Sequence, residues 1–147
     1  MNDAPSASPI EVYLTVSGGL QAINFYKAAF NADVVFQHMA DDGQRLMHAT
    51  LKMFGGQIML SDYFPEYSSD VAPPDKLGGS TVTVHVNLRW PAEVDAALAK
   101  AAAAGATITQ PAWDAFWGMR YGRLLDPFGH TWAFGAPFDP TSKGPTS

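Results

Sequence analysis

The sequence predicts an α+β fold made of two repeats of one strand-helix-three-strand (βαβββ) module. Asn31 and Gly105 each follow a helical pattern and are 105 − 31 = 74 residues apart. Gly56 and Gly129 each precede a closing strand and are 129 − 56 = 73 residues apart. An offset this constant is typical of an internal duplication.

The first repeat opens with a strand that alternates polar and apolar residues. Val12, Leu14 and Val16 share one face of this strand, and Glu11, Tyr13 and Thr15 share the other. A helix is predicted over 19–30, with Ser17 as its N-terminal cap and Asn31 as a left-handed C-terminal cap. The predicted strands of this repeat are 10–16, 33–40, 45–54 and 57–62.

A segment rich in Pro, Ser and Gly, residues 63–79, predicts a linker or surface flap. The pattern then restarts with a strand over 81–88 and a helix that begins at Pro91 and is capped by Gly105. A strand over 107–110 leads into an aromatic loop that contains Trp113, Phe116 and Trp117.

The chain from Trp113 to Phe134 therefore reads as a loop followed by a two-stranded hairpin. Asp126-Pro127-Phe128-Gly129 has the residues of a type I turn between strands 119–125 and 130–134. Trp132 and Phe134 share the face expected to be core. Gly118 is expected to allow a sharp turn, and Gly122 to leave room for a ligand.

Several motifs together resemble the vicinal oxygen chelate superfamily, which includes glyoxalase I, bleomycin-resistance proteins and extradiol dioxygenases. They are FYKAAF at 25–30, FWG at 116–118, RYG at 120–122 and DPFGHTW at 126–132. The PhnB-like branch is the most similar. The resemblance implies that the two modules form a curved mixed sheet with a concave cup, and that the helices lie on its convex side.

The domain boundaries follow from the repeat and the resemblance. Residues 10–136 are expected to form a single domain, flanked by a disordered N-terminal tail (1–9) and a C-terminal tail (137–147). Within the domain, module one is predicted over 10–63, the linker over 64–79 and module two over 80–136.

Composition excludes several classes of function. The net charge of −5, with scattered Lys and Arg, provides no basic surface for nucleic acid. The absence of cysteine excludes disulfides, thiolate metal sites and a cysteine nucleophile. No signal peptide or membrane-spanning run is present, which favours a soluble cytoplasmic protein. Only 16% of residues are charged, and this low charge, with the loop aromatics, favours a homodimer.

The resemblance places a divalent metal on four side chains, and these correspond to Glu11, Leu60, Thr83 and Ala133. Only Glu11 is a plausible ligand, and three protein donors are needed for a useful site, so no metal is expected. A register slip would instead involve Ser61, His85 or His130. In that alternative, Glu11 and His85 bind a divalent metal weakly.

Polar positions of the opening strands are expected to face the cup. Glu11, partly desolvated there, is the candidate general base, although a surface glutamate is the alternative. Arg120 is expected to grip an anionic ligand, with a salt bridge to Asp114 or Glu11 as the alternative. The loop aromatics either close the mouth of the cup or pack on a partner subunit. The predicted cup residues are Glu11, Tyr13, His48, His85, Trp117, Arg120 and Tyr121.

The favoured function is binding of a small organic molecule in the cup, without a metal. One alternative is a metal-dependent lyase or isomerase of the glyoxalase type, in which Glu11 moves a proton. Another is a non-catalytic, dimeric interaction protein. The methyltransferase label of the PhnB-like branch finds no support, because Gly18-Gly19 does not lie in a doubly wound topology.

Overall fold

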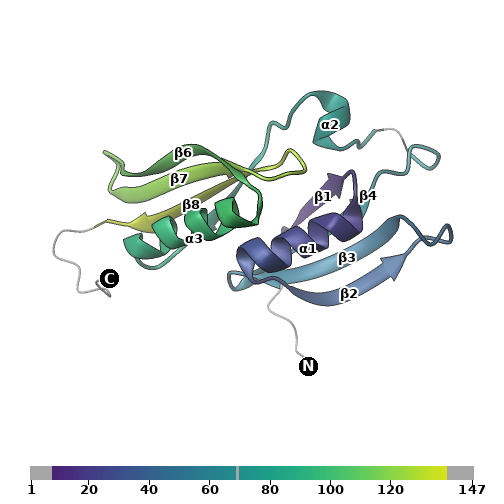
Figure 1. The fold of residues 1–147 in the computed structure, drawn as a ribbon, viewed down its shortest axis with the longest axis horizontal. Coiled ribbons are helices and arrows are strands. Elements are labelled where there is room, and N and C mark those ends of the chain that lie inside the picture. The colour runs from purple at the N-terminus through teal and green to yellow at the C-terminus, as the bar shows by residue number, and fades with distance from the viewer. Residues whose placement is uncertain (1–7, 69, 139–147) are drawn as a thin grey trace. The chain divides into compact units, whose positions relative to one another are not determined.

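The computed structural model describes residues 8–68 and 70–138. The chain divides into two compact units, Met1–Gly79 and Ser80–Ser147, which we call module one and module two. Each builds its own four-stranded sheet with one long helix (Figure 1), which confirms the predicted α+β fold of two βαβββ repeats. The predicted tails, 1–9 and 137–147, lie outside the described residues except for 8–9 and 137–138.

Module one contains the sheet β1-β4-β3-β2, in which β1 pairs with β4 in parallel and the other neighbours are antiparallel. The predicted linker is not wholly irregular, because it contains the short helix α2. The elements are β1 (Val12–Val16), α1 (Gly19–Phe30), β2 (Asp33–Met39), β3 (Leu46–Met53), β4 (Gly56–Asp62) and α2 (Pro74–Leu77).

Module two repeats this arrangement as the sheet β5-β8-β7-β6, again with a parallel pair between its first and last strands. The predicted duplication is therefore present in the connectivity as well as in the spacing of the turns. The elements are β5 (Thr83–Asn87), α3 (Pro91–Ala104), β6 (Thr107–Asp114), β7 (Met119–Leu125) and β8 (Thr131–Pro137).

The core of module one lies between α1 and its sheet. Tyr26 and Phe30, one helical turn apart, are buried with their rings stacked 5.7 Å apart. They face apolar strand residues such as Leu51 and Leu60, both fully buried. The helix ends at Asn31, whose φ of 55° confirms the predicted left-handed cap.

A buried carboxylate, not Ser17, caps the start of α1. Asp62, at the end of β4, accepts hydrogen bonds from the backbone N–H groups of Gly18 and Gly19 at 2.8 and 3.0 Å. It also accepts one from Leu46 at 2.8 Å. The prediction for Ser17 was wrong because its hydroxyl donates instead to Asp75 of α2 at 2.8 Å. Asp62 thus joins the helix to two strands.

The core of module two lies between α3 and β7–β8. Trp132 and Phe134 are buried, as the alternation of β8 predicted. Gly122 does not leave room for a ligand, because it faces the helix: a Cβ there would lie 2.4 Å from Cδ1 of Leu98. The missing side chain lets α3 approach the sheet closely.

The Asp126–Gly129 turn forms as predicted, with the Gly129 N–H donating to the Asp126 carbonyl at 3.1 Å. Asp126 is only 2% exposed, and its side chain does more than favour the turn, because it also forms buried hydrogen bonds. Its carboxylate accepts from the backbone N–H groups of Phe128 and His130 at 2.8 and 3.0 Å, and from the Trp132 indole at 3.0 Å. This residue therefore fixes the hairpin to the core.

The aromatic segment is only partly a loop. Trp113 belongs to β6, which runs to Asp114 instead of ending near Gln110 as predicted. Pro111 interrupts the expected pattern because it has no N–H to donate, and the β6–β7 pairing is irregular between Gln110 and Trp113. The turn that follows ends at Gly118, whose φ is 88°.

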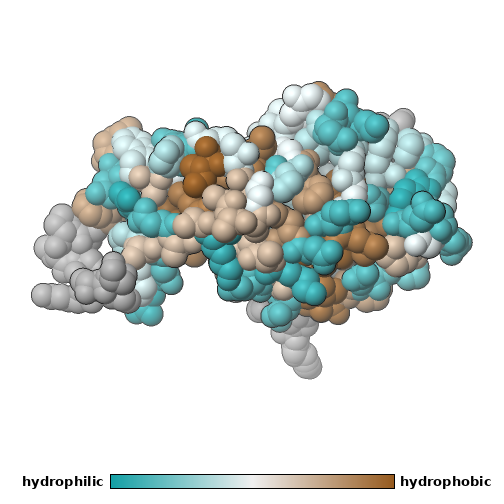
Figure 2. Space-filling view, viewed as in Figure 1, coloured by the Kyte–Doolittle hydropathy of each residue, from teal (hydrophilic) through white to brown (hydrophobic). Residues whose placement is uncertain are grey.

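The surface carries hydrophobic residues in patches among hydrophilic ones on the visible face of both modules (Figure 2). Such patches agree with the low content of charged residues. In the described ranges, no helix is long and apolar enough to cross a bilayer.

Candidate functional site

Each sheet has one face packed against the long helix of its own module and an opposite face, which we call the open face. In module one, Leu14 on β1 and Leu60 on β4 are register partners and are buried on the helix side. Their neighbours therefore lie on the open face. The open-face residues of β1, β3 and β4 include Tyr13, Thr15, His48, Thr50, Gln57, Met59 and Ser61.

Glu11 lies immediately before β1 and on its open side. Its two carboxylate oxygens accept hydrogen bonds from Nε2 of Gln57 at 3.1 and 3.0 Å. The residue is half-buried. This amide orients the carboxylate and leaves its remaining lone pairs for another donor.

Tyr13 and His48 form a hydrogen-bonded pair on the same face. The Tyr13 hydroxyl lies 2.8 Å from Nδ1 of His48, and Nε2 of His48 lies 3.3 Å from the Thr50 hydroxyl. The Phe36 ring lies 5.7 Å from the His48 ring. The sequence did not determine which face of the sheet His48 occupies, and the structure places it on the open face. Leu46 is two residues earlier, but a register shift separates the two residues, so Leu46 is buried while His48 is not.

In module two, the strand pairing likewise identifies the residues of the open face. His85 on β5 pairs with Ala133 on β8, which pairs in turn with Arg123 on β7. One row further along, Asn87 pairs with Gly135 and Gly135 with Tyr121. All of these residues lie on the face of the sheet that points away from α3.

The two open faces correspond residue by residue. In module one the equivalent row is Tyr13, Met59 and Thr50. We aligned this row with the row of His85, Ala133 and Arg123, and then matched the other residues by their distance along each strand from the aligned row. Tyr13 corresponds to His85, His48 to Tyr121, Thr50 to Arg123, Met59 to Ala133 and Ser61 to Gly135.

His85 and Tyr121 interact through their ring faces. The rings are nearly parallel, at 15°, with centroids 6.1 Å apart. Nε2 of His85 lies 3.1 Å from the Asn87 side-chain oxygen, which orients the imidazole. Gly135 lies beneath the ring, since a Cβ there would be 3.0 Å from Cε1 of His85. Only glycine leaves the imidazole this position without a shift.

Tyr121 continues into a cluster of exposed aromatic rings. Trp117 contacts Tyr121, Trp113 and Phe116 edge-to-face, at centroid distances of 5.6, 5.7 and 5.0 Å. Trp117 is 50% exposed and Phe116 is 91% exposed. We call Trp113, Phe116, Trp117 and Tyr121 the aromatic cluster.

Arg120 does not share a face with this cluster. It alternates with Tyr121 along β7 and pairs with Ala136 on the helix side. Its guanidinium forms salt bridges with Asp95 of α3 at 2.8 Å and with Asp114 at 3.0 Å. These hydrogen bonds, chiefly the one to Asp95, raise the pKa of Arg120, and burial opposes them. The salt bridge to Asp114 is the structural alternative that the sequence offered.

Arg123 is the open-face arginine, and the sequence interpretation did not select it. Its guanidinium carbon lies 6.0 Å from the centroid of the Tyr121 ring. The signal was available, because the alternation of 119–125 places Arg123 on the same side as Tyr121.

The predicted metal positions do not fit a metal. Leu60 is fully buried on the helix side, so the open face at this point of β4 carries Met59 and Ser61 instead. Ala133 lies on the open face but offers no donor atom. Among residues 8–68 and 70–138, no three His, Asp or Glu side chains are grouped closely enough to hold an ion.

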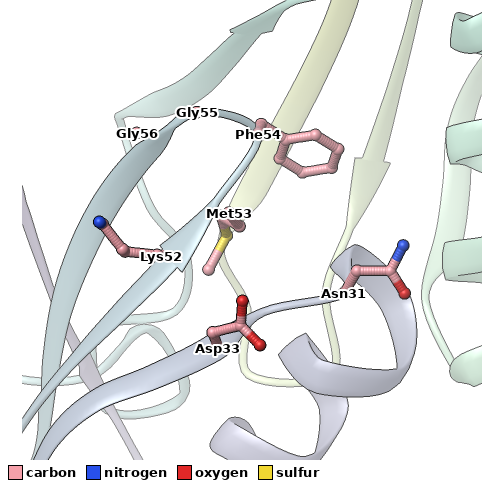
Figure 3. A pocket seen from close by; sticks show the side chains of 7 residues that line it. All are labelled: Asn31, Asp33, Lys52, Met53, Phe54, Gly55 and Gly56. Carbon is pink, nitrogen blue, oxygen red and sulfur yellow. The ribbon is translucent and has the colours of Figure 1, made fainter.

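One pocket, of about 370 Å³, belongs to module one, and none of the predicted site residues lines it. Asn31, the start of β2 and the β3–β4 turn line it (Figure 3). Phe54, in this turn, has a left-handed φ of 54°. The pocket has no cluster of acid–base or metal-binding side chains, so we do not assign the site to it.

The chain is similar to known proteins both in sequence and in fold. The sequence profile of the Glyoxalase/Bleomycin resistance protein/Dioxygenase superfamily matches residues 11–134. Uncharacterized protein Rv0887c of Mycobacterium tuberculosis is 38% identical over 138 residues, which are 93% of this chain and 77% of that protein.

Solved structures show the same fold. TioX from Micromonospora sp. ML1 is 27% identical, with a TM-score of 0.68 over 90% of this chain and 100% of that one. A PhnB protein from Bacillus cereus is 20% identical, with a TM-score of 0.66 over 88% of this chain and 99% of that one, a likeness of fold alone. The chain therefore belongs to the glyoxalase/bleomycin resistance protein/dioxygenase superfamily.

Proposed function

We propose that this protein binds a small aromatic molecule on the open face of module two, without a metal ion. The observation that carries the proposal is the aromatic cluster. Its edge-to-face rings hold one another in place, yet Trp117 and Phe116 are 50% and 91% exposed. Exposed rings that are already ordered bind a planar ligand at little entropic cost.

Other features support the same ligand class. Beside the cluster, the side chains of His85 and Met119 cover Gly135, since a Cβ there would lie 3.0 Å from an atom of each. His85 lies over Gly135 and presents a further ring. The superfamily includes bleomycin-resistance proteins, which the chain resembles and which sequester organic compounds. Assignment to the PhnB-like branch is part of this proposal.

The test is a titration monitored by ¹H–¹⁵N NMR with 2-naphthalenemethanol, a neutral aromatic probe. The indole N–H signals of Trp113 and Trp117 should shift. Trp117→Phe should weaken binding about fivefold, since one ring contact contributes about 1 kcal/mol. Trp90→Phe is the matched control, because Trp90 lies outside the cluster, and it should leave the affinity unchanged. Equal weakening by both variants, or no shift of the cluster, would contradict the proposal.

A second candidate function is that of a lyase or isomerase, and the polar side chains on the open face of module one support it. Tyr13 and His48 are hydrogen-bonded at 2.8 Å near Glu11, which keeps its proposed role as general base. If this function operates, a hemithioacetal of methylglyoxal should be converted, and Glu11→Gln should abolish turnover while preserving the fold. Absence of turnover in the native protein would remove this candidate.

We also propose a homodimer, with exposed apolar side chains outside the cluster, such as Val34 and Val35, as candidates for the interface. Light scattering at micromolar concentration tests it. The dimer should have twice the chain mass of 15.8 kDa, and the chain mass itself would contradict a dimer.

A further inference from the structure

We propose that the ligand of the aromatic cluster is an anion, a planar aromatic carboxylate or a related acid, and that Arg123 determines this specificity. The inference rests on the proposed function, because it concerns the same site. Two observations carry it: the position of Arg123 over the Tyr121 ring, and the engagement of every carboxylate among residues 80–138 by other partners.

The position of Arg123 follows from the ladder. It lies two residues after Tyr121 on the open face, and its guanidinium carbon is 6.0 Å from the Tyr121 centroid. Its Cα partner on β8 is Ala133, and its partner on β6 is Gln110. Neither neighbour carries a charge. The guanidinium thus lies over the Tyr121 ring, at the outer limit of a cation–π contact, and its donors are not used by either strand neighbour.

The acidic residues of module two that the structure describes bind other groups. Asp95 and Asp114 bind Arg120 on the helix side. Glu93 accepts the Trp90 N–H at the start of α3, at 2.9 Å. Asp126 accepts the Trp132 indole in the hairpin turn. In the described part of module two, these four are all of the carboxylates, so the charge of Arg123 has no counter-ion there.

This unneutralised charge decides between two uses of an aromatic cluster. Grouped tryptophan and tyrosine rings also form cages for organic cations, which bind over ring faces. Arg123 disfavours a cation at the same rings by like-charge repulsion. An anion gains instead, because the planar guanidinium donates two parallel hydrogen bonds to a carboxylate while the rings stack on the aromatic body.

The experiment compares three probes of one shape: 2-naphthoate, 2-naphthalenemethanol and 2-naphthylmethylammonium. Affinities are measured from the Trp117 indole shift in the intact chain. The native protein should prefer the carboxylate to the alcohol about tenfold, the effect of one exposed charge-assisted pair, and should bind the ammonium weakest. Arg123→Gln should abolish this preference, and Arg123→Lys should retain part of it.

Arg89→Gln is the matched control, because it removes one positive charge from the same module, where Arg89 lies over the Trp90 ring at 4.7 Å. It should leave the preference intact. Equal affinities for the three probes, a preference for the ammonium, or a carboxylate preference that survives Arg123→Gln would overturn the inference and leave the aromatic site standing. If no probe shifts the Trp117 signal at millimolar concentration, the proposed function falls, and the inference falls with it.

Discussion

The two modules place a tyrosine and a histidine at the same two ladder positions, but in exchanged order. Module one has Tyr13 on its first strand and His48 on its third, whereas module two has His85 and Tyr121. The first pair is hydrogen-bonded at 2.8 Å, and the second is stacked at 15°. One backbone framework thus supports a polar face in one module and an aromatic face in the other.

The neighbours of each pair contribute to the difference. Beneath His85 lies Gly135, and the ring occupies the space that a side chain would take. Module one has Ser61 at that position, and its hydroxyl donates to the Asp62 carbonyl at 3.0 Å. Asn87 also engages the imidazole of His85, where module one has Thr15. A single small residue at the centre of a sheet therefore permits ring stacking.

Each module has a buried carboxylate that joins its elements, but at a different place: Asp62 at the start of α1 and Asp126 in the last hairpin turn. Removing either carboxylate should produce the largest predicted loss of stability. Asp126→Ala removes the shared acceptor of Phe128, His130 and Trp132, and should cost about 4 kcal/mol of unfolding free energy. Asp62→Ala removes the cap of α1 and should cost about 3 kcal/mol. Urea denaturation measures both losses, and hydrogen exchange should locate each in its own module.

Asp41→Ala, in an exposed turn, is the control and should change stability by less than about 0.5 kcal/mol. If Asp62→Ala and Asp126→Ala both loosened the same module, the two carboxylates would not be the separate anchors that the hydrogen bonds indicate.

A smaller effect on stability should distinguish the Tyr13–His48 pair from the His85–Tyr121 pair. Tyr13→Phe removes the hydroxyl that meets His48 and should destabilise the fold by about 1 kcal/mol. Tyr121→Phe keeps the stacked ring and should be close to neutral. The ¹⁵N signals of His48 should respond to the first variant, and those of His85 should not respond to the second. Equal stability losses would mean that the hydroxyl of Tyr13 has no special role.

The smallest effect should be the pH dependence of stability that arises from Asp42, an exposed carboxylate of module one that forms an ion pair with Arg45. Hydrogen bonds from the backbone and then the side chain of Arg45 lower the pKa of Asp42 from 3.8 to about 2. Since the folded pKa is the lower one, ionised Asp42 stabilises the fold above about pH 4. This contribution is lost as the pH falls towards 2.

Melting temperatures of the native protein and Asp42→Asn test this prediction. The native protein should melt higher at pH 6, and most of the difference should be lost by about pH 2. High salt should reduce the difference at pH 6, because the group is exposed. A difference that persisted at pH 2 would contradict an ionic origin.

Much of the fold was predictable, because local patterns determine it. The alternation in β1 and β8, the caps at Asn31 and Gly105, and the Asp126 turn depend on neighbouring residues. The open-face positions of Tyr13 and His85 also followed from alternation. Trp113 was misplaced, because cross-strand pairing carries β6 through Pro111 despite its local tendency to end a strand.

The remaining errors concern contacts between distant residues. Ser17 was assigned as the cap, but Asp62 accepts the N–H of Gly18 from 44 residues further along the chain. Gly122 was read as free space, yet Leu98 fills it. The salt bridge from Arg120 to Asp95 of α3, 25 residues earlier, also joins residues far apart in sequence. Such contacts depend on packing, which local spacing does not encode.

The parallel pairing that closes each sheet also governs how the chain folds as it is synthesised. Val12 pairs with Ile58, and Thr83 pairs with Thr131, so each sheet joins the first strand of its module to the last. Neither sheet can close until the last strand of its module has left the ribosome. Module one can therefore complete its sheet while module two is still being translated, and the nascent chain passes through two separate periods of exposed strand edges.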